Sequence, residues 1–156
     1  MTNITAGACL LVGLLGACAP APSVELDGAV AYNTSGVPGS WSTLQLAING
    51  SASLHVAREA GSSQDFTGNA SAAALTALRD DIATADLGSL SSEYRCTDLV
   101  CDAPEPPRTL VVEVGGVTTT ISVEGRISNA QLPEGLVTVF RDLEATAKQL
   151  SSSTGS

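Results

Sequence analysis

Alternating apolar and polar residues mark a first β-hairpin at residues 44–56. The apolar positions, each separated from the next by a polar or small residue, are Leu44, Leu46, Ile48, Leu54 and Val56. A three-residue loop at residues 49–51 pairs Ile48 with Ala52 and Leu46 with Leu54, so that the apolar side chains share one face. A two-residue turn would place Leu54 on the wrong face. We therefore expect the three-residue loop.

A second alternation, at residues 110–121, predicts another hairpin. Leu110, Val112 and Val114 alternate with polar residues, and Gly115-Gly116 is a two-residue hairpin turn. This turn pairs Val114 with Val117 and Leu110 with Ile121, which again gives a mostly apolar face.

Apolar residues spaced three and four apart predict two helices, at residues 71–86 and 133–150. The first stripe consists of Leu75, Leu78, Ile82 and Ala85, and Ser71 can cap the N-terminus of this helix. The second stripe consists of Leu136, Phe140, Leu143, Ala147 and Leu150, with Pro133 in the first turn.

This order predicts an α+β domain over residues 24–150. We expect an antiparallel sheet built from the two hairpins, in the order ββαββα, with both helices on one face. Weak alternation at residues 24–32 adds an N-terminal strand to this expectation. Residues 61–68 and 89–107 are expected to be loops, and residues 151–156 a disordered tail.

Residues 4–17 form an uncharged apolar run that is shorter than a membrane-spanning helix. The run ends in Leu15-Gly16-Ala17-Cys18, which resembles the lipobox of bacterial lipoproteins. The resemblance implies a signal peptide at 1–17, lipid on Cys18, a tether at 18–23 and a place in the cell envelope. Ala19 after the cysteine implies the outer membrane if the cell is Gram-negative, and otherwise the outer face of the cell membrane. A secretory signal without lipid, or a buried apolar segment, are the alternatives.

The net charge of the chain argues against two classes of binding partner, nucleic acids and anionic lipids. The chain has 16 acidic and 7 basic residues, a net charge of −9. Because phosphate neutralisation dominates affinity for nucleic acid, we expect no nucleic-acid partner. We expect the same acidity to oppose attraction to anionic lipid, so the membrane contact is expected through the lipid on Cys18.

Cys96 and Cys101 remain after the signal peptide and the lipidated residue are set aside. In an exported protein a disulfide is the default interpretation. The alternatives are a metal site, which lacks histidine and further cysteine ligands nearby, and a free or redox-active thiol pair. We expect no metal and no cofactor.

His55 is the single histidine of the chain. Alternation directs it away from the side of Leu54 and Val56, and although Asp65 could complete a triad, no G-x-S-x-G motif supplies a nucleophile. The carboxylates Asp80 and Asp81 lie opposite the apolar helix stripe and are expected to face solvent. We therefore expect no catalytic residues and no enzyme.

The segment 93–108 is the best candidate for function, since a disulfide and three prolines would order it before binding. Its candidate binding residues are Glu93, Tyr94, Arg95, Asp98, Asp102 and Glu105. The alternative is that the segment stabilises a core poor in aromatic residues, which make up 3% of the chain.

The order of elements between residues 30 and 146 resembles the emfourin-like family. The shared features are a turn with Gly36 and Gly39, an Asn-Gly-type turn, a helix ending near Asp86-Leu87, Tyr94, the Gly-Gly hairpin and the proline-led helix. The family's named member inhibits thermolysin-type metalloproteases, so the resemblance implies an inhibitor with an envelope or secreted protease as partner. The Cys96–Cys101 insertion departs from the family, and no inhibitory residue is transferred. A structural or assembly lipoprotein is the alternative function.

Overall fold

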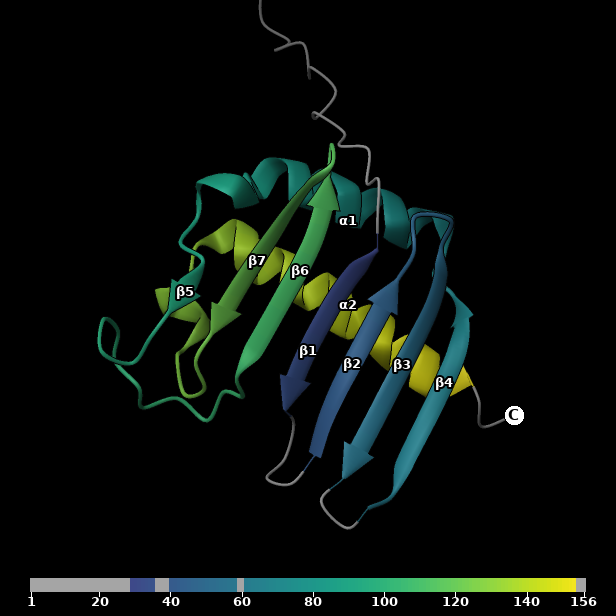
Figure 1. The fold of residues 1–156 in the computed structure, drawn as a ribbon, viewed down its shortest axis with the longest axis horizontal. Coiled ribbons are helices and arrows are strands. Elements are labelled where there is room, and N and C mark those ends of the chain that lie inside the picture. The colour runs from purple at the N-terminus through teal and green to yellow at the C-terminus, as the bar shows by residue number, and fades with distance from the viewer. Residues whose placement is uncertain (1–28, 36–39, 59–60, 154–156) are drawn as a thin grey trace, which may run out of the picture.

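The computed structural model describes residues 29–35, 40–58 and 61–153, which form a seven-stranded sheet with two helices (Figure 1). The strands lie in the order β4-β3-β2-β1-β6-β7-β5. In chain order the elements are β1 (Val30–Ser35), β2 (Ser40–Leu46), β3 (Ser51–Arg58), β4 (Ser63–Asn69), α1 (Ala72–Ala85), η1 (Leu87–Ser89), β5 (Glu93–Tyr94), β6 (Arg108–Val114), β7 (Val117–Val123), η2 (Asn129–Gln131) and α2 (Glu134–Ser153).

The predicted ββαββα antiparallel layout is wrong. β1 to β4 form a continuous antiparallel meander, and β1 also pairs with β6 at the centre of the sheet. β5 runs parallel to β7, so the sheet is mixed. β4 was predicted as a loop because its residues are mainly polar and exposed at the sheet edge, and β5 has two residues, too few for a pattern.

The register predicted for the first hairpin is also wrong. Leu44 pairs with Leu54 and Leu46 with Ala52, so Ile48 lies in the turn and is 44% exposed. Gly50 adopts a φ of +89° in this turn, and a Cβ there would meet Leu75 at 2.9 Å. The glycine conformation and the close approach of α1 favour a longer turn than the alternation indicated.

The second hairpin confirms its predicted register. Val114 pairs with Val117 and Leu110 with Ile121. Gly115 and Gly116 both have positive φ, as a tight two-residue hairpin turn requires.

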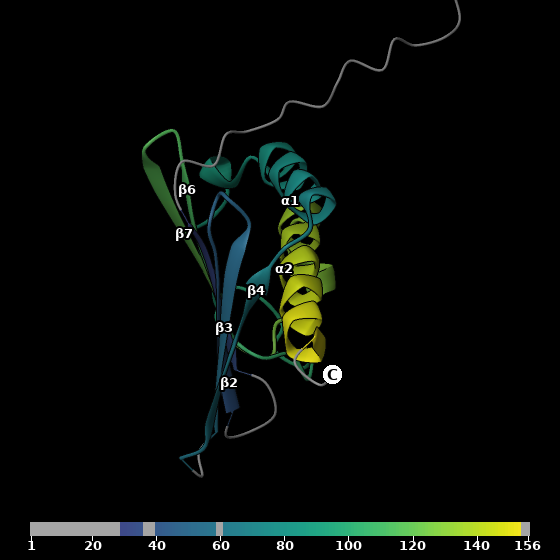
Figure 2. The ribbon, with the colours of Figure 1, turned by 90° about the vertical axis from the view of Figure 1, so that its right-hand side faces the viewer.

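Both predicted helices are confirmed, and they cover one face of the sheet (Figure 2). The Ser71 side chain accepts a hydrogen bond from the N–H of Ala74, which caps α1 as expected. α2 continues to Ser153, so the expected disordered tail is wrong for residues 151–153.

The core lies between the helices and the face of the sheet that they cover, here called the inner face. Its largest fully buried side chains are Tyr32, Phe140, Leu44, Leu110, Ile121, Ile127, Leu136 and Leu143. The opposite, outer face of the sheet carries small polar residues such as Ser53, Thr67, Thr109 and Thr120, which alternate with the inward residues.

The signal peptide at 1–17, the tether at 18–23, Cys18, Gly36, Gly39 and the last three residues of the tail lie outside the described residues. In the part of the chain that is described, no helix has the length and apolar character needed to cross a membrane.

Candidate functional site

The segment 95–107 between β5 and β6, here called the clamped loop, contains the disulfide. Cys96 and Cys101 are bonded, with 5.5 Å between their Cα atoms, as the sequence predicted. The N–H groups of Asp98 and Leu99 both donate to the carbonyl of Arg95. A compact turn therefore lies between the two cysteines.

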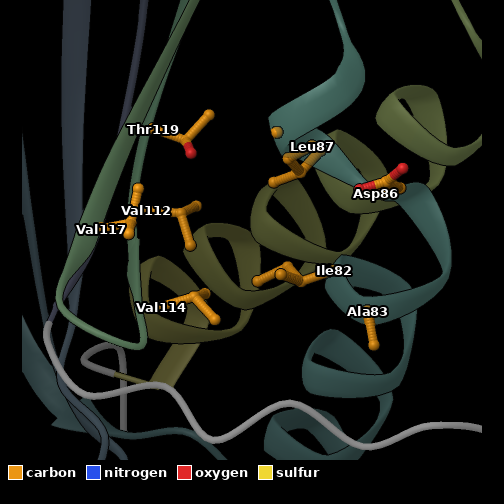
Figure 3. Close-up of a pocket in the computed structure, with 9 residues that line it drawn as sticks. Ile82, Ala83, Asp86, Leu87, Val112, Val114, Val117 and Thr119 are labelled. Atoms are coloured by element: carbon orange, nitrogen blue, oxygen red, sulfur yellow. The ribbon is translucent and has the colours of Figure 1, made fainter.

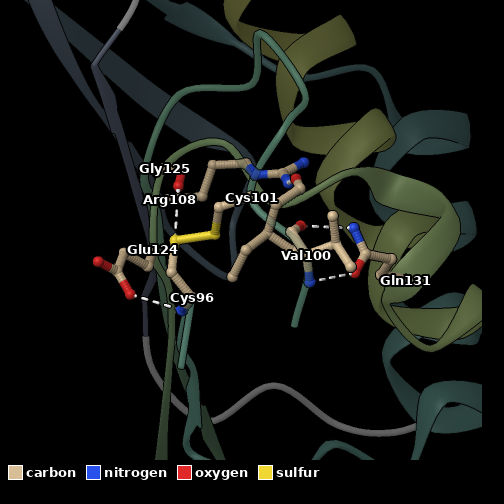
Figure 4. The surroundings of a disulfide bond; sticks show 8 residues. Cys96, Val100, Cys101, Arg108, Glu124, Gly125 and Gln131 are labelled. Atoms are coloured by element: carbon tan, nitrogen blue, oxygen red, sulfur yellow. Dashed lines mark hydrogen bonds between the residues drawn. A yellow bond between two sulfur atoms is a disulfide. The ribbon is translucent and has the colours of Figure 1, made fainter. Parts of the chain in front are cut away.

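Gln131, in η2, holds the end of this turn. Its side-chain nitrogen donates to the Val100 carbonyl at 2.8 Å, and its side-chain oxygen accepts from the Val100 N–H at 2.9 Å (Figure 4). The amide thus satisfies both backbone groups of Val100 and fixes the main chain beside the disulfide.

Backbone contacts fix the rest of the loop. Cys101 forms a β-bridge with Ile127, and the N–H of Ala103 donates to the carbonyl of Arg126 at 3.1 Å. The N–H of Arg126 in turn donates to the carbonyl of Glu105 at 2.7 Å. The Glu124 carboxylate also accepts from the N–H of Cys96 at 2.7 Å.

Arg108 supports the segment that carries Gln131. Arg108 is only 3% exposed; its side chain donates to the Asn129 side chain at 2.5 Å and lies 4.9 Å from the centre of the Phe140 ring. It also donates to the Ile127 carbonyl at 3.4 Å. The buried guanidinium of Arg108 therefore attaches η2 to the core, and Gln131 of η2 in turn holds the clamped loop.

The clamped loop presents its tip to solvent. Val100 is 63% exposed although its backbone is held on both sides, and Thr97, Asp98 and Asp102 are exposed around it. This arrangement offers a partner a rigid apolar residue surrounded by polar groups.

The predicted binding residues differ in what they do. Glu93 and Arg95 form an exposed ion pair. Tyr94 is half-buried and packs against the core, and this burial raises the pKa of its phenol. Glu105 is half-buried and contributes its backbone carbonyl. Tyr94 and Glu105 are therefore mainly structural.

A shallow hollow of about 560 Å³ lies beside the loop. Its walls include Tyr94, Arg95, Thr97, Thr109 and Glu124. The structure thus brings two of the predicted binding residues, Glu93 and Arg95, and the base of the loop to one side of the sheet.

Sequence reasoning missed Val100, Gln131 and Glu124. An apolar Leu-Val pair between two cysteines in a polar loop is a signal that could have identified Val100. Gln131 bonds to Val100, which is 31 positions away in the sequence, and Glu124 bonds to Cys96, which is 28 positions away. Contacts over such separations leave no local pattern in the sequence.

The other candidates lie apart from this loop. His55 points to the outer face, as predicted, and its Nδ1 lies 2.6 Å from the Asp65 carboxylate on β4. The pair is exposed on a flat sheet rather than in a cleft, with 44% and 75% of the two side chains accessible. Among the described residues, no three potential metal ligands come together.

Neither the models of protein families nor the curated proteins give a match to this chain.

Proposed function

We propose that this chain is an envelope-anchored, non-catalytic binding protein whose clamped loop docks on another protein. The first partner to test is a thermolysin-type metalloprotease, the kind of target that the emfourin-like resemblance implies. The proposed anchor is a lipid on Cys18.

One observation carries the proposal: the exposed side chain of Val100 stands on a backbone that Gln131 and the disulfide fix. Binding usually costs entropy because loops and side chains must be ordered. Here the loop's conformation is already set by internal bonds, so a partner that buries Val100 meets less of this cost.

The polar residues around Val100 complete the surface. Exposed Asp98 and Asp102 flank the apolar tip, while Arg95 is paired with Glu93. An apolar residue at the centre with polar groups at the rim is the usual anatomy of a protein interface.

The test compares two exposed valines in the full chain. We expect Val100→Asp to weaken binding to the protease by about tenfold or more, because it places a charge where the interface excludes water. Val117→Asp, in a valine that is 65% exposed on a different hairpin, is the matched control and should bind as the wild type does.

Binding is measured by surface plasmon resonance, and inhibition by hydrolysis of a peptide substrate. The proposed inhibition would be refuted if the wild type failed to bind or inhibit the protease. Protein docking through the loop would be refuted as well if Val100→Asp captured the same envelope proteins as the wild type. Retention of the Cys18→Ala variant in the membrane fraction would contradict the lipid anchor.

A further inference from the structure

Among the described residues, no strand pairs with the first half of the β7 edge that faces away from β6. In the described structure, β5 pairs with β7 at Ser122 and Val123. The Val114–Val117 pair closes a two-residue hairpin, so Thr118 and Thr120 direct their N–H and C=O groups away from β6. These groups form a short row that another extended chain can pair with.

An apolar pocket of about 240 Å³ opens beneath this edge (Figure 3). Val112, Val114 and Val117 line it from the hairpin, and Ile82 and Leu87 line it from the helical layer. The pocket thus has the size and lining for one aliphatic side chain.

We propose that the β7 edge and this pocket form a second binding surface, which takes an extended peptide of another protein as an added strand. The backbone of the peptide pairs with Thr118 and Thr120, and one aliphatic side chain enters the pocket. Strand addition combines main-chain hydrogen bonds with pockets for alternate side chains in this way.

Charge indicates the kind of peptide. Asp86 is exposed at the rim of the pocket, and the residues that line the pocket include no basic side chain. The whole chain carries a net charge of −9, which opposes the approach of a second copy and favours a basic partner. The peptide should therefore have a lysine or arginine two positions from its aliphatic residue, on the same face of the added strand.

The experiment uses the full chain and a fluorescent probe peptide, Lys-Thr-Val-Thr-Lys, with blocked ends. Fluorescence anisotropy measures the affinity. We expect saturable binding, and a loss of about tenfold or more when the central valine of the peptide is replaced by serine. N-methylation of the amides that face β7 should abolish binding, because it removes strand pairing.

Variants of the protein locate the site. Val117→Asp should weaken peptide binding by about tenfold or more, whereas the equally exposed Val100→Asp should leave it unchanged. For the protease partner, the proposed function predicts that Val100→Asp weakens binding and that Val117→Asp does not. The two proposals can therefore be refuted independently. Circular dichroism confirms that each variant is folded.

Three outcomes would overturn the inference. One is no saturable binding of the probe to the folded wild type. Another is binding that survives N-methylation or Val117→Asp. The third is dimerisation of the full chain, seen by sedimentation, that Val117→Asp abolishes, since the edge would then pair with a second copy.

Discussion

At the scale of single residues, Asp142 on α2 and Asp81 on α1 form a carboxyl pair between the helices. Burial, hydrogen bonding with Asp81 and the negative charge of Asp81 together raise the pKa of Asp142 to about 6, while Arg141 opposes the shift. Because the folded pKa lies above the unfolded value, the ionised pair lowers the free energy of unfolding above pH 6. This loss disappears as the pH falls through 6 towards 4.

We therefore expect Asp142→Asn to stabilise the protein at pH 8. The gain should be on the order of 1 kcal/mol or less, because water screens this partly exposed pair. Near pH 4 the gain should vanish, since the wild-type carboxyl is then protonated. Urea unfolding at the two pH values measures the difference, with Asp98→Asn in the exposed loop as the control. An equal gain at both pH values would contradict the assigned cause.

Contacts between residues that are close in the sequence could be predicted. Ser71 caps a helix whose donors lie three residues away, and the two cysteines are close enough along the chain to join. The amide of Gln131 meets Val100 because η2 and the loop are folded against each other. A contact of that kind depends on the tertiary structure, so the sequence alone could not predict it.

At the scale of elements, α1 and α2 pack closely against each other at Gly135. A Cβ on this residue would lie 2.8 Å from the Cα and 2.9 Å from the Cβ of Ala85. The Cα is a backbone atom and the Cβ is bonded directly to it, so neither can move without shifting α1. The small residues at this crossing therefore set the distance between the two helices.

Gly135→Ala should destabilise the protein by roughly 1–3 kcal/mol, because overpacking outweighs the better helix propensity of alanine. Gly88→Ala is the control, since a Cβ at Gly88 meets no atom within 4 Å. Thermal unfolding followed by circular dichroism compares the two variants. Equal melting temperatures would show that the helices can separate at little cost.

The two helices and the second hairpin were predicted correctly, whereas the first hairpin had a wrong register despite its alternation, and β4 and β5 were missed. The β6–β7 hairpin has clear alternation and a Gly-Gly turn, and its register is as expected. β4 is a polar edge strand and β5 has two residues, so neither carries the periodicity that burial imposes.

At the scale of the whole molecule, the helices cover one face of the sheet and the clamped loop and the β7 edge lie towards its β5 end (Figure 1). The two helices could be predicted from their periodicity, whereas the predicted layout of the sheet was wrong. The central position of β1 could not be predicted, because its pairing with β6 joins residues from opposite parts of the chain. The clamped loop was singled out from its cysteines and prolines, whereas the exposure of Val100 at its tip required the structure.

The β1–β6 pairing also bears on how the chain folds. Neighbouring strands in the β1–β4 meander and in the β6–β7 hairpin are close in sequence, and their ends can meet quickly. β1 and β6 are far apart in the sequence, so their pairing, here called the β1–β6 seam, carries most of the loop-closure entropy cost of forming the sheet. Formation of the seam should therefore limit the rate of folding.

Leu110→Ala, at a buried position of β6 that pairs with Tyr32 of β1, should slow refolding by about tenfold and change the unfolding rate much less. Stopped-flow measurements over a range of urea concentrations separate the two rates. If the substitution instead accelerated unfolding alone, the seam would form after the barrier. Pairing of β1 with β6 would then be a late step in folding and not part of the folding nucleus.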